Sequence, residues 1–342
     1  MRHTSPAGSL RAALAPHSSL LAGLPMFRLI AFILISVYAA LTPVRAATQP
    51  LLSPPELAAR LADPQLRVID IRAGTQEGKP AYDVGHIPGA LSAPYAKWRG
   101  PKDNPGRLPD TAKLSALIQS LGIDSGTPVV VVYEGADATE FGAAARVVWT
   151  LKAAGLANVS ILNGGMKSWR AAGQPVTQEV GTVPPSRYAV KLDDQLIATQ
   201  DEVAQVLARQ SARLLDARPA PYFHGETRHA AARTPGTLVG AKNVSHDVWF
   251  VGDSATMQST DEVRRIAARE GIETDVATVS FCNTGHWAAT NWFVLSEVLG
   301  QKEVKLYPES MVGWSQAGLP MANVPGRLAQ FWLQIREAVG AL

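Results

Sequence analysis

Cysteine is almost absent from this sequence of 342 residues, because Cys282 is the only one. A single thiol excludes an internal disulfide framework and any zinc site built from several cysteines. His224 and His229 are five residues apart rather than the four that place two ligands on one helix face, so we predict no metal site. Whatever chemistry Cys282 performs, it performs unpaired.

Charge is also sparse. Charged residues make up 18% of the chain and the net charge is +3, which is too weak and too scattered to indicate a nucleic-acid partner. Hydrophobic residues make up 46%, enough to build a sizeable core, so a disordered chain is excluded. The length favours two domains of ordinary size.

Long hydrophobic runs are missing except for residues 29–41, LIAFILISVYAAL. A run of about 13 residues is shorter than a membrane-spanning helix needs, and the small residues at 46–47 suit signal-peptidase cleavage. We therefore predict a signal peptide within 1–47, no membrane span after its removal, and a periplasmic or secreted location. A membrane anchor and a buried core helix are the alternatives. The low-complexity start predicts that translation begins at Met26, with Met1 as the alternative.

The chain contains an internal duplication, because residues 159–175 align with residues 304–320 at a constant offset of 145. Upstream, the Asp-x-Arg element after a hydrophobic run also occurs twice. The matched pairs are Trp169 with Trp314, Gly173 with Gly318, Asp70 with Asp216, and Arg72 with Arg218. Both halves therefore share one fold.

Each half alternates short β-branched runs with helical patterns, which predicts parallel strands joined by crossover helices. The fold class is α/β, with two tandem domains that each contain a mostly parallel sheet flanked by helices. Predicted strands cover 67–71, 128–134, 158–162, 213–217, 277–281 and 303–307, and predicted helices cover 141–154 and 287–299.

Domain boundaries follow from the same patterns. We predict an N-terminal domain over 48–178, a proline-containing linker over 179–194, and a C-terminal domain over 195–325. Residues 326–342 carry apolar side chains at helical spacing, which predicts a final helix docked on the domains.

Cys282 ends the predicted strand 277–281 and is followed by a loop and by a helix that begins near Ala288. Sites in parallel α/β sheets lie beyond the carboxyl ends of the strands. Backbone N–H groups of this loop and the following helix would stabilise a thiolate, and Gly285 would let the loop curl. In the first half the equivalent residue is Glu134, in a loop about three residues longer, so the N-terminal domain is predicted to be non-catalytic. For a lone cysteine, a small buried hydrophobic residue is the alternative interpretation.

Here the sequence resembles the tandem-domain rhodanese family, the thiosulfate and 3-mercaptopyruvate sulfurtransferases, from about Leu51 to Ala322. The resemblance is carried by four segments in the family's order. They are YDVGHIPGA at 82–90, AARVVW at 144–149, LNGGMKSW at 162–169, and the strand, cysteine, loop and helix around Cys282.

The resemblance implies a sulfurtransferase that works without a metal or organic cofactor. The Cys282 thiolate would attack the outer sulfur of a small anionic donor, sulfite or pyruvate would leave, and a thiophilic acceptor such as cyanide or a thiol would take the persulfide sulfur. The implied persulfide loop consists of Asn283, Thr284, Gly285, His286, Trp287 and Ala288. Thiosulfate is the predicted donor; 3-mercaptopyruvate, or a role as a persulfide carrier without turnover, are the alternatives.

The loop departs from the family pattern, because thiosulfate-specific relatives carry cationic residues where Asn283 and Thr284 stand. The mercaptopyruvate-type Gly-Ser-Gly loop is absent too, and the family's substrate-facing Arg falls on Tyr222. Candidates for the missing positive charge are His286, Arg218, Arg228, His229 and Arg233, each with a plain surface or ion-pair role as the alternative. Asp216 is predicted to pair with Arg218. Trp314 is predicted to be a packing residue, and Trp287 is predicted to line the pocket.

Two other enzyme classes are disfavoured. Phosphatases of a related fold use a Cys-x5-Arg loop, and the place of that Arg is taken by Ala288. A serine hydrolase lacks the Gly-x-Ser-x-Gly turn that it needs.

Overall fold

The computed structural model describes residues 49–326 apart from Glu77, together with Leu328. The predicted signal peptide and, except for residue 326 and Leu328, the predicted C-terminal helix lie outside the described residues. Within the described part of the chain, no helix is both long and apolar enough to cross a bilayer.

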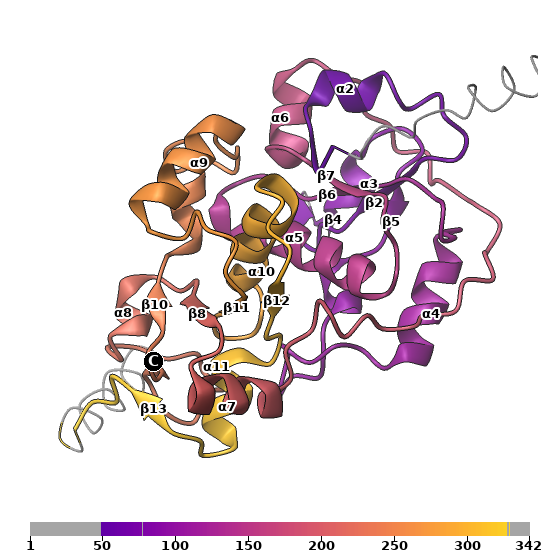
Figure 1. Ribbon diagram of the computed structural model, residues 1–342. Coiled ribbons are helices and arrows are strands. Elements are labelled where there is room, and N and C mark those ends of the chain that lie inside the picture. The colour runs from indigo at the N-terminus through magenta and orange to yellow at the C-terminus, as the bar shows by residue number, and fades with distance from the viewer. Residues whose placement is uncertain (1–48, 77, 327, 329–342) are drawn as a thin grey trace, which may run out of the picture. The chain divides into compact units, whose positions relative to one another are not determined.

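The first half forms a five-stranded, fully parallel sheet in the order β1-β7-β6-β2-β5 (Figure 1). Its strands are β1 (Leu51–Leu52), β2 (Arg67–Asp70), β5 (Leu91–Ser92), β6 (Val129–Val132) and β7 (Val159–Leu162). Its helices are α2 (Pro54–Ala58), α3 (Ala81–Val84), α4 (Thr111–Ser120), α5 (Ala138–Ala153) and α6 (Gly165–Ala171), with the 3-10 helix η1 (Tyr95–Trp98). A short hairpin pairs β3 (Thr75–Gln76) with β4 (Lys79–Pro80).

The four valines of β6 explain why this sheet is covered on both faces. Val130 and Val132 belong to the apolar cluster with α2, α3 and α6, whereas Val129 and Val131 belong to the cluster with α4 and α5. Alternate side chains of a strand point to opposite faces, so a continuous β-branched run needs a helical layer on each side.

The second half repeats this plan with the parallel order β10-β8-β11-β12. Its strands are β8 (Arg213–Asp216), β10 (Lys242–Asn243), β11 (Thr278–Phe281) and β12 (Val304–Leu306), and β9 (Thr237–Leu238) pairs with β13 (Met321–Ala322) apart from them. Its helices are α7 (Gln200–Arg209), α8 (Ala220–Phe223), η2 (His246–Trp249), α9 (Thr260–Arg269), α10 (Trp287–Trp292), the π-helical turn η3 (Phe293–Val298) and α11 (Ser310–Gln316). The predicted α/β fold with two tandem domains is confirmed.

Two predicted helices differ from the observed ones in detail. Helix α5 begins at Ala138 rather than at residue 141, because the Asp137 side chain accepts the N–H of Glu140 and caps the helix there. The single helix predicted over 287–299 is α10 followed by the π-helical η3. Residues 179–194, the predicted linker, contain no helix or strand.

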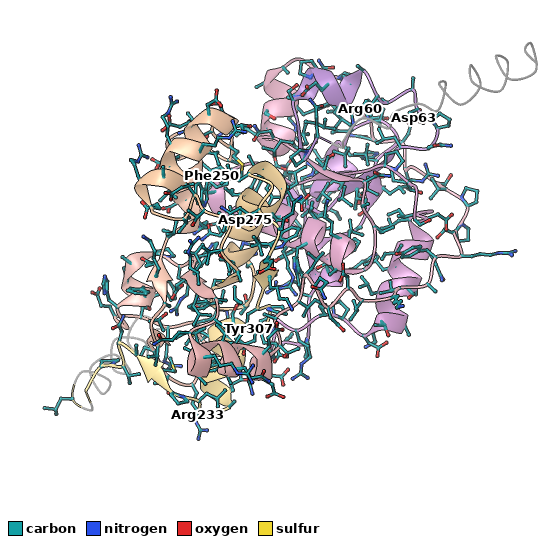
Figure 2. The ribbon with its side chains drawn as sticks, viewed as in Figure 1. Arg60, Asp63, Arg233, Phe250, Asp275 and Tyr307 are labelled. Atoms are coloured by element: carbon teal, nitrogen blue, oxygen red, sulfur yellow. The ribbon has the colours of Figure 1, made fainter. Side chains whose placement is uncertain are left out.

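The two halves are joined by one continuous apolar cluster in which α5 packs on its copy α10 (Figure 1). Phe141 of α5 lies edge-on to Phe250 and Phe293 of the second half, with ring centroids 5.0 and 5.6 Å apart. Figure 2 marks Phe250 near this junction. The carboxyl end of β11 therefore faces residues of the first half as well as its own domain.

Candidate active site

Cys282 follows the last residue of β11, the strand that lies between β8 and β12. Its N–H donates to Ser310 Oγ at 3.0 Å, and its carbonyl accepts the N–H of Met311 at 3.1 Å. The residue therefore stands at the carboxyl end of a central strand, where parallel sheets place their sites. Its side chain is buried, with 1% of its surface exposed.

Gly285 and Ser310 set the shape of the loop. Gly285 has φ +66°, and a Cβ there would lie 2.6 Å from Arg146 Nη1 and 2.7 Å from the Pro308 carbonyl oxygen, so no other residue fits without displacement. Ser310, also at positive φ, accepts the N–H groups of Cys282 and Gly285 on Oγ and donates to the Tyr307 carbonyl oxygen. These three hydrogen bonds offset the backbone strain of a buried non-glycine residue in this region.

The remaining amides of the loop are free. Within the described part of the chain, no hydrogen-bond acceptor meets the N–H groups of Thr284, His286 or Trp287. N–H groups that lack an acceptor around the start of a helix can form a concave site for an anion. The loop can therefore hold a negatively charged group that this chain does not itself supply.

Two arginines of the first half reach the carbonyl side of this loop. Arg146 of α5 is fully buried, and its Nη1 donates to the carbonyl oxygens of Thr284 at 3.2 Å and Gly285 at 3.3 Å, while Nη2 donates to Gly106. Arg99, just after η1, donates from Nη2 to the Thr284 carbonyl oxygen at 2.9 Å. Burial, followed by repulsion from Arg99, lowers the pKa of Arg146 to about 9.

His286 connects the loop to the first half through both ring nitrogens. Nε2 lies 2.7 Å from the Thr139 carbonyl oxygen and must donate to it, so Nδ1 accepts from the Tyr95 hydroxyl at 2.8 Å. Burial, with a further contribution from the Arg99 charge, lowers the pKa of His286 to about 3. His286 is therefore neutral at physiological pH and contributes no positive charge to the loop.

Arg218, a candidate for substrate binding, is engaged in the interior. Its guanidinium forms a bidentate pair with Asp216, with a shortest distance of 2.6 Å, and donates to the Gly236 carbonyl oxygen. Nη1 donates to Asn283 Oδ1 at 3.3 Å. Arg218 therefore supports the loop through Asn283 and forms the structural pair predicted with Asp216.

The other candidates lie around the loop at different depths. Tyr222 packs edge-on to Trp287, which stacks on His246 at 4.9 Å. His229 is half-buried, and burial and the charge of Arg99 both lower its pKa. Arg233 is exposed at the margin of the second half (Figure 2).

The remaining three candidates have structural contacts. Arg228 donates from Nη1 to the Ala232 carbonyl oxygen. The buried Ala288 accepts from Ser280 Oγ. Trp314 donates from its indole N–H to the Pro320 carbonyl oxygen, as Trp169 does to Pro175 in the first half, which is the packing role predicted for it.

Two cavities adjoin the loop. One of about 350 Å³ is lined by His286, Tyr95 and strand-end residues of the first half. Another of about 560 Å³ is lined by Trp287, by Pro219 just before α8, by residues 137–139 of the first half and by residues of and after η2. Cys282 lines neither of these two. Because only 1% of the residue is exposed, a reactant can reach the sulfur only when neighbouring side chains move.

Sequence reasoning missed the contributions of the first half. Arg146 gave a usable signal, because a charged residue within the apolar helical segment AARVVW is rarely buried without a partner. Arg99 and Tyr95 gave none, since their positions relative to the loop depend on how the two halves pack. Ser310 gave none because it contacts Cys282 from a later segment of the second half, 28 residues away.

Comparison with known proteins gives consistent matches over both halves. Residues 53–172 and 199–317 each match the rhodanese-like domain. The chain is 31% identical over 278 residues to the sulfur carrier protein TtuD of Thermus thermophilus, covering 77% of this chain and 93% of that protein. It is 28% identical over 317 residues to a protein of Synechococcus elongatus that is provisionally named a thiosulfate sulfurtransferase, covering 89% and 96%.

Solved structures share the same architecture. The 3-mercaptopyruvate sulfurtransferase SseA from Escherichia coli matches with a TM-score of 0.66 and 26% identity, covering 77% of this chain and 99% of SseA. An anaerobic ergothioneine biosynthesis enzyme from Chlorobium limicola matches with a TM-score of 0.69 and 21% identity, covering 80% and 70%, which is a likeness of fold alone.

Proposed function

The chain belongs to the rhodanese family of sulfurtransferases, and on that premise we propose that it transfers the outer sulfur of thiosulfate to a thiophilic acceptor through a persulfide on Cys282. The observation that carries this proposal is the strand-end cysteine followed by a loop in which the N–H groups of Thr284, His286 and Trp287 have no acceptor among the described residues. The first half has neither feature, since Glu134 stands at the equivalent position.

The chemistry needs two displacements at sulfur. The Cys282 thiolate attacks the outer sulfur of thiosulfate, the sulfur–sulfur bond of the donor breaks, and sulfite leaves with the electron pair. The product is a cysteine persulfide anion, whose terminal sulfur accepts from the free loop amides. Cyanide or a thiolate then attacks that terminal sulfur and returns Cys282 as a thiolate. No electron is gained from or lost to an outside agent.

The burial of Cys282 favours a thiol that forms a persulfide over an exposed thiol without a function. A 1% exposed sulfur is shielded from bulk oxidants, and the persulfide would form in surroundings where water is excluded. This burial also limits access, because a donor must displace neighbouring side chains to reach the sulfur.

Two alternatives remain within the family. The similarity to SseA favours 3-mercaptopyruvate as donor, with pyruvate as the leaving product, and the similarity to TtuD favours a persulfide carrier. The loop sequence Asn283-Thr284-Gly285 has neither the cations nor the Gly-Ser-Gly pattern that would decide between donors.

The deciding experiment is a donor panel on the purified protein, with the mass of the Cys282 peptide measured after each donor. We expect thiosulfate to add one sulfur atom to Cys282 and thiocyanate to form when cyanide is present. Cys282→Ser should reduce turnover by at least a thousandfold, whereas Glu134→Gln at the equivalent position should change it less than twofold. A stable persulfide without turnover would identify a carrier, and no added sulfur from any donor would refute the proposal.

We also propose that the mature protein is exported, on the strength of the apolar run at residues 29–41. The N-terminal peptide of the mature protein, measured by mass spectrometry in the periplasmic and medium fractions, should begin near Ala47.

A further inference from the structure

The sulfur-transfer step proposed above brings three negative charges together, one on the thiolate and two on thiosulfate. Amides alone stabilise such an encounter only in part, and a site with low dielectric makes unbalanced charge costly. The loop itself contributes no cation, because residues 283–288 contain only His286 as a titratable group, and that imidazole is neutral. The balancing charge must therefore come from another element.

The second half does not provide it. Arg218 is neutralised by Asp216 in a buried bidentate pair, and Arg233 is exposed at the domain margin. Arg228 is held through Nη1 by the Ala232 carbonyl oxygen. Neither Arg218 nor Arg233 has a described contact with the carbonyl groups of Thr284 or Gly285.

Arg99 has the required features. Its Nη2 holds the Thr284 carbonyl oxygen at 2.9 Å, its guanidinium lies 5.2 Å from the centre of the Tyr95 ring, and its Nη1 is buried with no hydrogen-bond partner among the described residues. Its charge contributes to the lowered pKa of both His286 and His229. A buried guanidinium nitrogen without an acceptor is costly unless a ligand supplies one.

Arg146 adds a second charge behind the loop. It is fully buried, its Nε has no partner among the described residues, and no carboxylate in the described part of the chain forms an ion pair with it or with Arg99. Its hydrogen bonds go only to carbonyl oxygens, and the groups near it that can become anionic are Tyr95 and Cys282. Two cations without carboxylate partners therefore flank the Cys282 loop, and both come from the other half of the molecule.

We propose that Arg99 and Arg146 form the anion subsite of this active site, with Arg99 Nη1 binding the anionic oxygens of a sulfur donor and Arg146 supplying fixed positive charge behind the loop. The inference rests on the proposed function for its physiological ligand and names a sulfur oxyanion as that ligand. The subsite also explains why the first half is retained although its own strand-end position carries no thiol. The first half completes the site of the second half.

The test uses two alkylating reagents that differ in charge but not in chemistry. Iodoacetate and iodoacetamide both alkylate the Cys282 thiolate and release iodide, so the ratio of their rate constants measures the anion preference of the site. We expect Arg99→Gln to lower the iodoacetate to iodoacetamide ratio at least fivefold and to raise KM for thiosulfate at least tenfold. Lys97→Gln, an exposed lysine two residues earlier in η1, should change either quantity less than twofold.

Folding and function are separated by two further measurements. Arg99→Lys retains one charge and one donor to Thr284, so it should keep most of the thermal stability and give an intermediate ratio. If Arg99→Gln and Arg99→Lys both leave the ratio and KM unchanged, the subsite is refuted while the proposed function stands. If the wild type forms no persulfide with any donor yet the ratio still falls in Arg99→Gln, the anion subsite stands and the proposed function fails.

Discussion

The two copies of the fold differ in whether the amides of the strand-end loop have an internal carboxylate as acceptor. In the first copy, Glu140 turns back so that its Oε2 accepts the N–H groups of Gly135 at 2.9 Å and Ala136 at 2.7 Å. Glu134, the counterpart of Cys282, is paired with Arg72 at 3.1 Å and Arg170 at 2.7 Å. The first copy therefore fills its anion site with its own carboxylate.

The second copy keeps the same scaffold and leaves that site open. Asp216 and Arg218 reproduce the pair of Asp70 and Arg72, and in both copies the Arg donates to the carbonyl oxygen of an equivalent glycine at 2.8 Å. The residues that follow the central strand differ, with Glu134 in the first copy and Cys282 in the second. In the first copy an internal carboxylate accepts two loop amides, whereas in the second copy the N–H groups of Thr284, His286 and Trp287 have no acceptor among the described residues.

The largest effect should come from the glycine that curves each loop. Gly285→Ala introduces a methyl group 2.6 Å from Arg146 Nη1 at a positive φ, and we expect a loss of about 2–4 kcal/mol in the free energy of unfolding. The displaced loop should also lower kcat/KM at least tenfold, since small misplacements of reacting groups are costly.

Gly135→Ala in the first copy is the matched variant, because its methyl group would lie 2.1 Å from the Gly164 carbonyl oxygen. It should cost similar stability in urea unfolding but leave kcat/KM of the folded protein within twofold. Equal losses of activity in the two variants would contradict the assignment of catalysis to the second copy.

The next largest effect is the pH dependence of stability, which should come from His286 in the loop of the second copy. Its pKa is about 3 in the folded protein and about 6.5 when unfolded, so the unfolded state binds the extra proton between these values. Stability should fall as the pH drops below about 6.5, by about 1.4 kcal/mol per pH unit until the folded-state pKa is reached. Urea unfolding at several pH values should show a shallower acid slope in His286→Gln.

The control for this measurement is His224→Gln, which removes an exposed histidine of the same half. Its acid slope should match that of the wild type. A slope in His286→Gln equal to that of the wild type would mean that burial and the Arg99 charge do not hold the imidazole neutral.

The smallest expected effect comes from removing the carboxylate that occupies the loop amides of the first copy. Glu140→Ala removes the carboxylate that occupies the Gly135 and Ala136 amides, and should cost about 1–2 kcal/mol. Added sulfate should then raise its Tm more than that of the wild type, because the vacated amides can bind the ion.

Asp83→Ala, which removes an exposed carboxylate of the same domain, controls for general salt effects. It should respond to sulfate as the wild type does. If sulfate stabilises Glu140→Ala no more than Asp83→Ala, the first-copy loop is not an anion site.

The sequence was informative wherever the signal was local. The β-branched runs predicted the central strands within one or two residues, and the offset of 145 predicted the repeated fold. The place of Cys282 after β11 also followed from the chain alone, because strand, loop and helix are contiguous there. The burial of its side chain did not, since the covering residues come from elsewhere.

Local order along the chain determined the duplicated α/β scaffold, the pairing of Asp216 with Arg218, and the position of the thiol at a strand end. Tertiary structure alone decided the surroundings of that thiol. Arg99 and Arg146 contact the Thr284 carbonyl oxygen across 185 and 138 residues of sequence. Contacts over such separations depend on how α5 packs against α10, and no periodicity or spacing in one segment records the charge that another segment brings to it.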